Sequence, residues 1–143
     1  MSIKNRLIES LATLILMTSI SFGQSSEKKA DCNFLKRFLE IDQARYILGI
    51  DSYKNIPIVF VDSKRYFQGC VLDSFNKKKV EISNDSTLSD RVHASYITIK
   101  HFQKIGKKYK FVVFHKNTDA LIQVSFGKKR HKIIVEDYSI GYF

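Results

Sequence analysis

Apolar side chains recur at helical spacing between residues 32 and 48. Phe34, Phe38 and Ile41 lie three or four residues apart, which places them on one face of a helix. Gly49 follows the last apolar position, where a residue with positive φ commonly ends a helix. The pattern therefore predicts one long amphipathic helix over residues 32–48, whose apolar face needs a partner surface.

Two short runs of β-branched and apolar residues follow. Residues 56–61 (IPIVFV) and residues 80–82 (VEI) each predict a short strand. Residues 62–70 (DSKRYFQGC), which lie between them, permit two interpretations. In the first, Asp62 or Ser63 caps a short helix, and in the second the segment forms a tight turn.

The C-terminal third alternates strand-like runs with turns, and its register can be chosen so that apolar side chains share one face. A three-residue turn at residues 105–107 places Lys104 opposite Lys108. The predicted strands are residues 94–104, 108–116, 120–126 and 131–140. Their shared apolar face carries Ile97, Ile99, Tyr109, Phe111, Val113, Ile122, Val124, Phe126, Ile133 and Val135. This pattern predicts an antiparallel meander that packs on the helix.

The opposite face of this predicted sheet is not uniformly polar. Phe102, Val112, Phe114 and Ile134 fall on it in the same register. Either another element covers these side chains or they form an interaction surface.

Together these elements predict an α+β fold, with one long N-terminal helix packed on an antiparallel β-meander. In outline, the helix and the meander resemble the cystatin-like and NTF2-like folds. The resemblance concerns architecture alone, because the sequence carries no inhibitory or catalytic motif of either family, such as the Q-x-V-x-G segment.

The N-terminus has the pattern of an export signal. Lys4 and Arg6 precede an apolar run, and Ser21 and Gly23 place small residues at a cleavage site. The alternative is a retained membrane anchor, but the run is shorter than the ~20 residues of a membrane-spanning helix. We therefore expect no transmembrane segment after cleavage. The predicted organisation is a signal peptide over residues 1–23, a flexible leader over residues 24–30 and a single α+β domain over residues 31–143.

The two cysteines lie after the predicted cleavage point. In an oxidising compartment Cys32 and Cys70 allow one intramolecular disulfide, with two free buried thiols as the alternative. The cleavage region and the aromatic, Lys- and Ile-rich chain that follows resemble exported proteins of Gram-negative bacteria. We therefore expect a periplasmic or extracellular protein.

The chain is strongly basic, with a formal net charge of +10 over its 143 residues. Such a charge favours anionic partners, here lipopolysaccharide, an acidic glycan or nucleic acid, or a protein partner with an acidic surface. The alternative is that the charge serves only colloidal solubility.

The basic residues concentrate in two of the predicted turns. In an up-and-down meander the first and third turns lie at the same end of the sheet, so the two groups of cations should meet there. A candidate anion-binding site follows, made of Lys104, Lys107, Lys108, Lys128, Lys129, Arg130 and Lys132. The alternative is that these lysines protect exposed turns and strand edges from aggregation.

Catalytic chemistry finds little support in the sequence. In the predicted register His101 and His115 lie about 13 Å apart, too far to act on one phosphate as acid and base. His131 is nearer to His101, across the end of the sheet. There is no G-x-S-x-G motif, and the spacing of cysteines and histidines predicts no metal site and no cofactor.

The sequence thus predicts a small exported, non-enzymatic binding domain whose basic sheet end contacts an anionic envelope component or a partner. One alternative is a secreted hydrolase acting on nucleic acid. Another is an inhibitor or immunity-type protein that blocks its partner with the outer face of the sheet.

Overall fold

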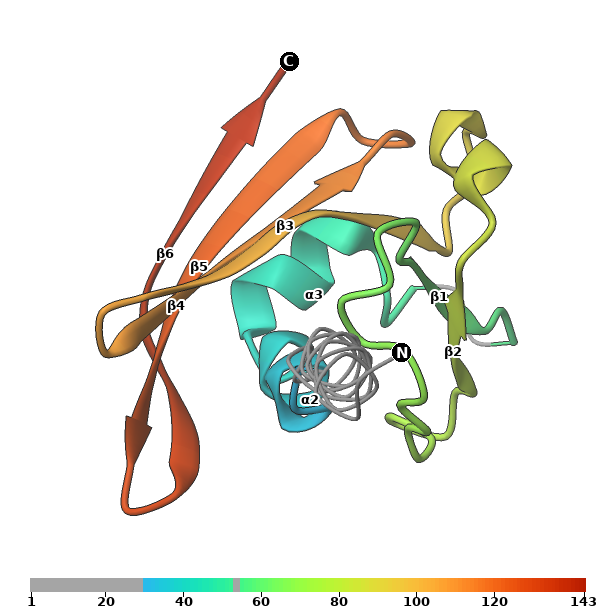
Figure 1. Cartoon of the computed structure of the whole chain (residues 1–143). Coiled ribbons are helices and arrows are strands. Elements are labelled where there is room, and N and C mark those ends of the chain that lie inside the picture. Colours follow the sequence, from blue (N-terminus) through green and yellow to red (C-terminus); the bar gives the residue numbers. More distant parts are fainter. Residues whose placement is uncertain (1–29, 53–54) are drawn as a thin grey trace, which may run out of the picture.

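The computed structural model describes residues 30–52 and 55–143. The fold is α+β, with a six-stranded mixed sheet in the order β2-β1-β3-β4-β5-β6. Figure 1 shows the α-helices of this part of the chain enclosed between the curved β3–β6 part of the sheet and the β1–β2 part. The elements are α2 (Asn33–Leu39), α3 (Asp42–Leu48), β1 (Ile58–Val61), β2 (Val80–Ser83), the 3-10 helix η1 (Ser86–Asp90), β3 (Tyr96–Ile105), β4 (Lys108–His115), β5 (Ala120–Lys129) and β6 (Lys132–Tyr142).

The predicted signal peptide, residues 1–23, lies outside the described residues, as does the predicted leader apart from Ala30. The backbone N–H of Ala30 donates a hydrogen bond to the carbonyl of Tyr66 at 3.1 Å. Within the described part of the chain, no helix has the length and apolar character needed to cross a membrane.

The single long helix predicted over residues 32–48 is wrong, because the chain leaves the helical conformation at Ile41 (φ −75°, ψ 107°). A helix turns by about 100° per residue. If it were unbroken, Asp42 and Arg45, four and seven residues after Phe38, would face the core. The break instead turns inward the buried side chains of α3, Ala44 and Leu48.

The antiparallel meander predicted for the C-terminal third is confirmed for β3–β6. Its apolar face packs on the helices, and the rings of Phe38 and Phe111 lie 5.4 Å apart between centroids. The face contains the buried residues Ile97, Ile99, Phe111, Val113, Ile122, Val124, Phe126 and Ile133. Burying each such side chain contributes about 1.5–3 kcal/mol, so this face contributes substantially to stability.

The first hairpin differs from the predicted register by one residue. Its turn contains two residues rather than three, so Lys104 lies opposite Tyr109 and not opposite Lys108. A β-bulge between Ile99 and His101 adds one residue to β3 and restores the predicted alignment further along. The outward placement predicted for Phe102 is therefore wrong: Phe102 lies opposite Phe111, and its partly buried ring packs against the core.

The sheet is not antiparallel throughout, which corrects the predicted architecture. β1 pairs in parallel with β2 on one side and with β3 on the other. Parallel neighbours need long crossovers, which residues 62–79 and 84–95 provide. All four residues of β1 are buried, as expected of a parallel strand covered on both faces.

Residues 62–70 form successive turns and no helix, which decides between the two interpretations. Arg65 has a positive φ of 58°, which a right-handed helix does not allow. The carboxylate of Asp62 accepts hydrogen bonds from the backbone N–H groups of Tyr66 and Phe67, at 3.0 and 2.7 Å. The turns carry Phe67 into the core, where its ring centroid lies 5.1 Å from that of Phe102.

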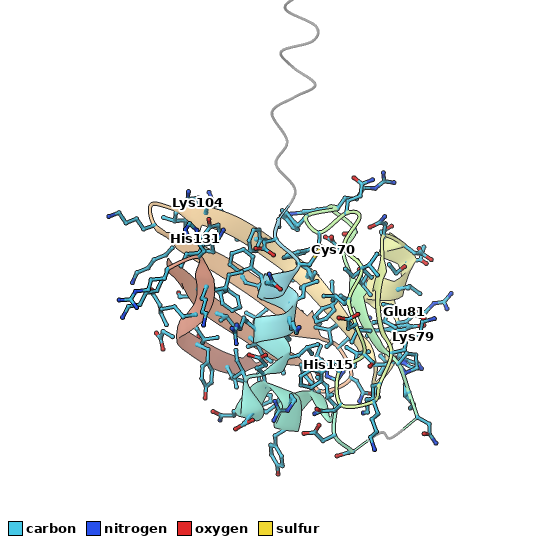
Figure 2. The ribbon with its side chains drawn as sticks, turned by 90° about the horizontal axis from the view of Figure 1, so that it is seen from below. Cys70, Lys79, Glu81, Lys104, His115 and His131 are labelled. Carbon is cyan, nitrogen blue, oxygen red and sulfur yellow. A yellow bond between two sulfur atoms is a disulfide. The ribbon has the colours of Figure 1, made fainter. Side chains whose placement is uncertain are left out.

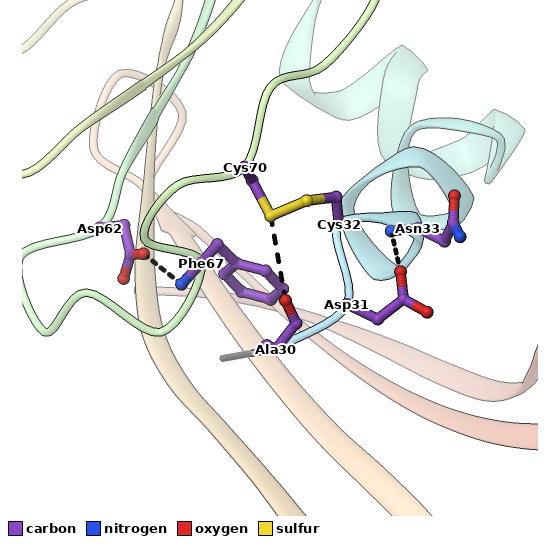
Figure 3. Close-up of a disulfide and its surroundings, with 7 residues drawn as sticks. All are labelled: Ala30, Asp31, Cys32, Asn33, Asp62, Phe67 and Cys70. Atoms are coloured by element: carbon purple, nitrogen blue, oxygen red, sulfur yellow. Dashed lines mark hydrogen bonds between the residues drawn. A yellow bond between two sulfur atoms is a disulfide. The ribbon is translucent and has the colours of Figure 1, made fainter. Parts of the chain in front are cut away.

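The predicted disulfide between Cys32 and Cys70 is present, with an S–S distance of 1.99 Å and a Cα–Cα distance of 5.5 Å. It joins the start of α2 to the end of the 62–70 segment, as Figure 3 shows. Beside it, Asp31 accepts a hydrogen bond from the N–H of Asn33 at 2.9 Å. A disulfide-bonded pair is compatible with an exported protein.

Candidate functional site

Two hairpin turns lie at the same end of the sheet. Lys108 at the start of β4 is opposite Gly127 in β5, and the β5–β6 hairpin closes at Lys129, so it projects about two residues, or ~7 Å, beyond the β3–β4 turn. Figure 2 shows Lys104 and His131 close to this end, far from the pair formed by Lys79, just before β2, and Glu81 on β2. We call this region the basic end; its cations, all exposed, are Lys104, Lys107, Lys108, Lys128, Lys129, Arg130 and Lys132.

Strand alternation divides these cations between two faces. Lys104 and Lys128 lie on the side of the helices. Each follows a core-facing residue of its strand, Phe102 in β3 and Phe126 in β5, by two positions, and residues two apart in a strand share a face. On the outer face are Lys108, Lys129 and Lys132, and the turns themselves carry Lys107 and Arg130. The basic end therefore presents charge in several directions around the tips of the two hairpins.

The two hairpins share one aromatic ring. The Nζ atoms of Lys104 and Lys128 lie 5.8 and 5.4 Å from the centroid of Tyr109. Tyr109 in turn packs against Phe34 of α2, with centroids 4.7 Å apart, and Lys128 Nζ lies 5.8 Å from that second ring. Each such contact at an exposed site contributes about 0.5–1 kcal/mol. These contacts hold two cations from separate hairpins beside one another.

The sequence pattern placed Tyr109 on the apolar face of the meander but missed its role as the ring that Lys104 and Lys128 both contact. The arrangement depends on the two-residue turn that pairs Lys104 with Tyr109. Gly106 was the available signal, because it adopts a φ of +62° in this turn and glycine is favoured in short hairpins at such positions.

Most of the charge at the basic end has no counter-charge. Lys108 forms an ion pair with Glu136, with 3.2 Å between Nζ and Oε2. Gly127 makes the pair possible, because a Cβ at this position would overlap the Glu136 side chain. Among the residues that the structure describes, no carboxylate lies within 4.0 Å of the other six cations. The basic end therefore has a large unneutralised positive charge.

An open groove of about 320 Å³ runs from the basic end along the outer face of the sheet. Lys108 and Lys110 lie on one side of it, and Asp137 lies on the other. The remaining lining residues are Ile105, Tyr109, Gln123, Val124, Ser125, Tyr138 and Ser139. The groove combines polar side chains with apolar surface, and its two lysines extend the positive surface away from the turns.

The tip of the longer hairpin has an unusual backbone. Arg130 and His131 form its two-residue turn with φ values of 50° and 64°, between the paired residues Lys129 and Lys132. Two successive positive φ angles define a type I′ turn, for which Asn-Gly is strongly preferred. Residues with a Cβ are destabilised in this conformation by about 1 kcal/mol or more each. The turn is therefore strained by its own side chains.

We expect the double substitution Arg130→Asn/His131→Gly to raise the free energy of unfolding by about 1–2 kcal/mol, because it relieves this strain. Urea denaturation would measure the change. Gly106→Ala is the matched control in the other hairpin: its φ is +62° and its added methyl group would meet no atom within 4 Å, so we expect a loss of about 1 kcal/mol from the backbone alone. A stability unchanged by the Asn-Gly turn would show that Arg130 and His131 are not strained.

The histidines hold separate partners and do not form an acid–base pair with one another. His101 hydrogen-bonds Gln103 at 3.0 Å, and His93 stacks on Tyr96 with ring centroids 4.4 Å apart. His131 occupies the tip of the β5–β6 hairpin. His115 is buried between Thr118 and the loop before β3, far from His131 in Figure 2.

His115 is a structural residue whose protonation opposes folding. Its Nε2 donates to the carbonyl oxygen of Ala94 at 2.8 Å, because a carbonyl can only accept, and its Nδ1 accepts from the Thr118 hydroxyl at 2.8 Å. Burial lowers the pKa of His115 below its usual 6.5, although the Ala94 hydrogen bond opposes the shift. The neutral ring thus joins the β4–β5 turn to the start of β3.

We expect stability to fall as the pH drops through 6.5, because unfolded chains then bind a proton that folded His115 does not. This contribution is complete above the unfolded pKa and is lost as the pH falls toward the folded pKa. Unfolding free energies at about pH 7.5 and about pH 5 would measure it. The decrease should be smaller in His115→Gln and unchanged in His101→Gln; equal decreases in all three proteins would contradict the assignment.

Within residues 30–52 and 55–143, no group of three or more His, Cys, Asp or Glu side chains could hold a metal ion. The basic end, with its seven cations, is the candidate site on which a function can be argued. Comparison of the chain with protein-family models, with curated proteins and with solved structures finds no significant match.

Proposed function

We propose that this protein is an exported, non-enzymatic domain that binds a polyanion through its basic end. The observation that carries the proposal is the unneutralised charge: of the seven cations gathered there, only Lys108 has a carboxylate within 4.0 Å among the described residues. Like charges held close together oppose folding, and an anionic partner would remove that cost while releasing its own counterions.

The strained turn supports the same proposal independently. Asn-Gly would form this hairpin at lower cost, yet the chain has Arg130 and His131 at its tip. Strain of this kind persists where the side chains serve a purpose other than stability. A basic side chain at the tip of a projecting hairpin is well placed to reach a phosphate, sulfate or carboxylate group on a large partner.

Binding without turnover is the function we propose, rather than nucleic-acid hydrolysis. A hydrolase would need an acid and a base within reach of one phosphate. His101 and His115 are instead occupied by Gln103 and by Thr118 with Ala94. The disulfide fits a protein of an oxidising compartment, where lipopolysaccharide and acidic glycans are available partners.

Charge reversal at the basic end tests the proposal. We expect Lys107, Lys108, Lys128, Lys129 and Arg130, changed together to Glu, to abolish retention on immobilised heparin at about 0.15 M salt. The parent should be retained, and its binding should weaken steeply as salt rises, by close to one power of the salt concentration for each anionic group contacted. Thermal melting of each variant would confirm that it is folded.

The matched control reverses five exposed cations elsewhere: Lys36, Lys64, Lys77, Arg91 and Lys100. Each set of five reversals lowers the net charge of the chain from +10 to 0, so the two proteins differ only in where the charge lies. We expect the control to keep most of its heparin affinity. Equal losses in both variants would show that net charge, and not the basic end, governs binding.

A further inference from the structure

The strand β6 forms a long open edge of the sheet. It contains 11 residues and pairs only with β5, whereas β2 at the other edge contains four. Unpaired N–H and C=O groups along such an edge are a template for another strand. Ile134 on this edge is 38% exposed, so an apolar side chain accompanies the open backbone groups.

The ladder between β5 and β6 shows which backbone groups are free. Lys129 and Lys132 close a two-residue hairpin, so they form a hydrogen-bonded pair, and hydrogen-bonded and non-hydrogen-bonded pairs alternate beyond them. Ile134, opposite Gly127, therefore bonds to β5. The N–H and C=O groups of Ile133 and Val135 point away from β5, toward the open edge.

The charge along this edge is self-complementary. The edge begins with Lys132, continues with three apolar residues (133–135) and then has Glu136 and Asp137. If an identical strand runs antiparallel to it about a two-fold axis at Ile134, Lys132 lies opposite Glu136. The regular edge is limited to this stretch, because His131 belongs to the turn before it and a β-bulge with Glu136 as its extra residue follows Val135. Two-fold interfaces require such a pattern, because each contact occurs twice with the roles exchanged.

We propose that a second copy of this chain docks on residues 132–136 of β6, antiparallel and centred on Ile134. In this register Ile133 of one copy and Val135 of the other exchange backbone hydrogen bonds across the interface. These bonds use the N–H and C=O groups that β5 leaves unpaired. A groove of about 600 Å³ between β6 and the helices, lined by Arg37, Glu40, Ile41, Asp42, Gln43, Ile133 and others, leaves room beside the edge. The paired edges join two six-stranded sheets into one.

The register has two consequences. Five residues from each copy form a short interface, so the dimer is weak and its population depends on protein concentration. Glu136 bridges Lys108 within its own chain and Lys132 of the second copy. The proposal does not rest on polyanion binding, and the two fail in different experiments.

Disulfide cross-linking tests the register. The native cysteines are both in a disulfide, so Ile134→Cys introduces a single thiol. Opposite residues of a non-hydrogen-bonded antiparallel pair have Cα atoms about 4.5 Å apart, which permits a disulfide. We expect mild oxidation to cross-link Ile134→Cys at least about tenfold faster than Tyr142→Cys, a control that is 64% exposed on the same strand. Equal or slower cross-linking would overturn the proposal.

Sedimentation over a range of concentrations gives the second test. Lys132→Glu places Glu opposite Glu136 twice and should weaken self-association about tenfold or more, whereas Lys132→Glu/Glu136→Lys restores the charge pairs and should recover it. Ile134→Lys, at an exposed position, should also abolish the dimer while leaving the monomer folded. A parent protein that remains monomeric at every concentration, or a double variant that does not recover, would refute the β6 dimer.

Discussion

Removal of the Cys32–Cys70 disulfide is expected to lower the free energy of unfolding by about 4 kcal/mol. The two cysteines are 38 residues apart, and a cross-link over such a loop reduces the conformational entropy of the unfolded chain by about that amount. Domains of this size are stable by about 5–15 kcal/mol in total. The reduced protein should therefore be close to the limit at which it remains folded.

The structure shows why the effect should be felt throughout the fold. The disulfide joins α2, whose Phe34 and Phe38 are buried, to a segment without helix or strand that places Phe67 in the core. Without the link, only side-chain packing and a few hydrogen bonds hold residues 62–70 against the helix. Reduction should loosen this segment first.

Urea denaturation of Cys32→Ala/Cys70→Ala beside the oxidised parent would measure the loss. The double variant is preferable to a single one because it leaves no unpaired thiol. The parent in reductant should match it, and heparin retention at low salt should survive in any fraction that stays folded, since the cations of the basic end belong to the β3–β4 and β5–β6 hairpins. A loss below about 1 kcal/mol would show that the unfolded chain is compact without the cross-link.

The meander could be predicted because its strands are neighbours in the chain. Each pairing of β3–β6 closes through a short turn, so the alternation of apolar residues and the turn residues decide it locally. The details that failed depend on single residues: the two-residue turn at Gly106, and the bulge that turns Phe102 inward. Nothing in the alternation near Lys100 indicates an extra residue.

The first half of the fold was less predictable for two different reasons. The break at Ile41 has a local signal, because the apolar phase set by Phe34 and Phe38 shifts at Ala44 and Leu48, and one helix cannot bury both sets. The parallel pairing of β1 has a weaker signal, its continuous apolar run. Which strands flank it depends on contacts between distant parts of the chain.

The candidate site divides in the same way. The up-and-down order of the strands is enough to place the two basic turns at one end of the sheet, and this prediction does not require the exact register. Two contacts depend on the register and on side-chain positions, and the sequence did not predict them. They are the meeting of Lys104 and Lys128 at Tyr109 and the ion pair between Glu136 and Lys108. The open edge of β6 follows from the order of strands in the sheet, which the sequence pattern did not reveal.

Asp62 is expected to be the most sensitive single position outside the apolar core. Its side chain is fully buried, and its two carboxylate oxygens accept the backbone N–H groups of Tyr66 and Phe67 at 3.0 and 2.7 Å. These bonds shape the turns that bring Phe67 into the core, as the close-up in Figure 3 shows for Phe67. An unsatisfied buried N–H group costs about 1–3 kcal/mol.

Asp62→Ala should therefore lower the free energy of unfolding by about 2–5 kcal/mol, since two donors lose their acceptor together. Asp62→Asn keeps one acceptor oxygen and should lose roughly half as much, which makes it the variant to measure if the alanine protein does not fold. Ser63→Ala, an exposed neighbour, is the matched control and should change stability by less than about 0.5 kcal/mol.

Urea denaturation would measure the free energy of unfolding, and amide hydrogen exchange at Tyr66 and Phe67 would measure the protection of the two N–H groups. If Asp62→Ala were as stable as the parent, or if the two amides stayed equally protected, other acceptors would have to hold this segment, and its path into the core would not depend on the carboxylate.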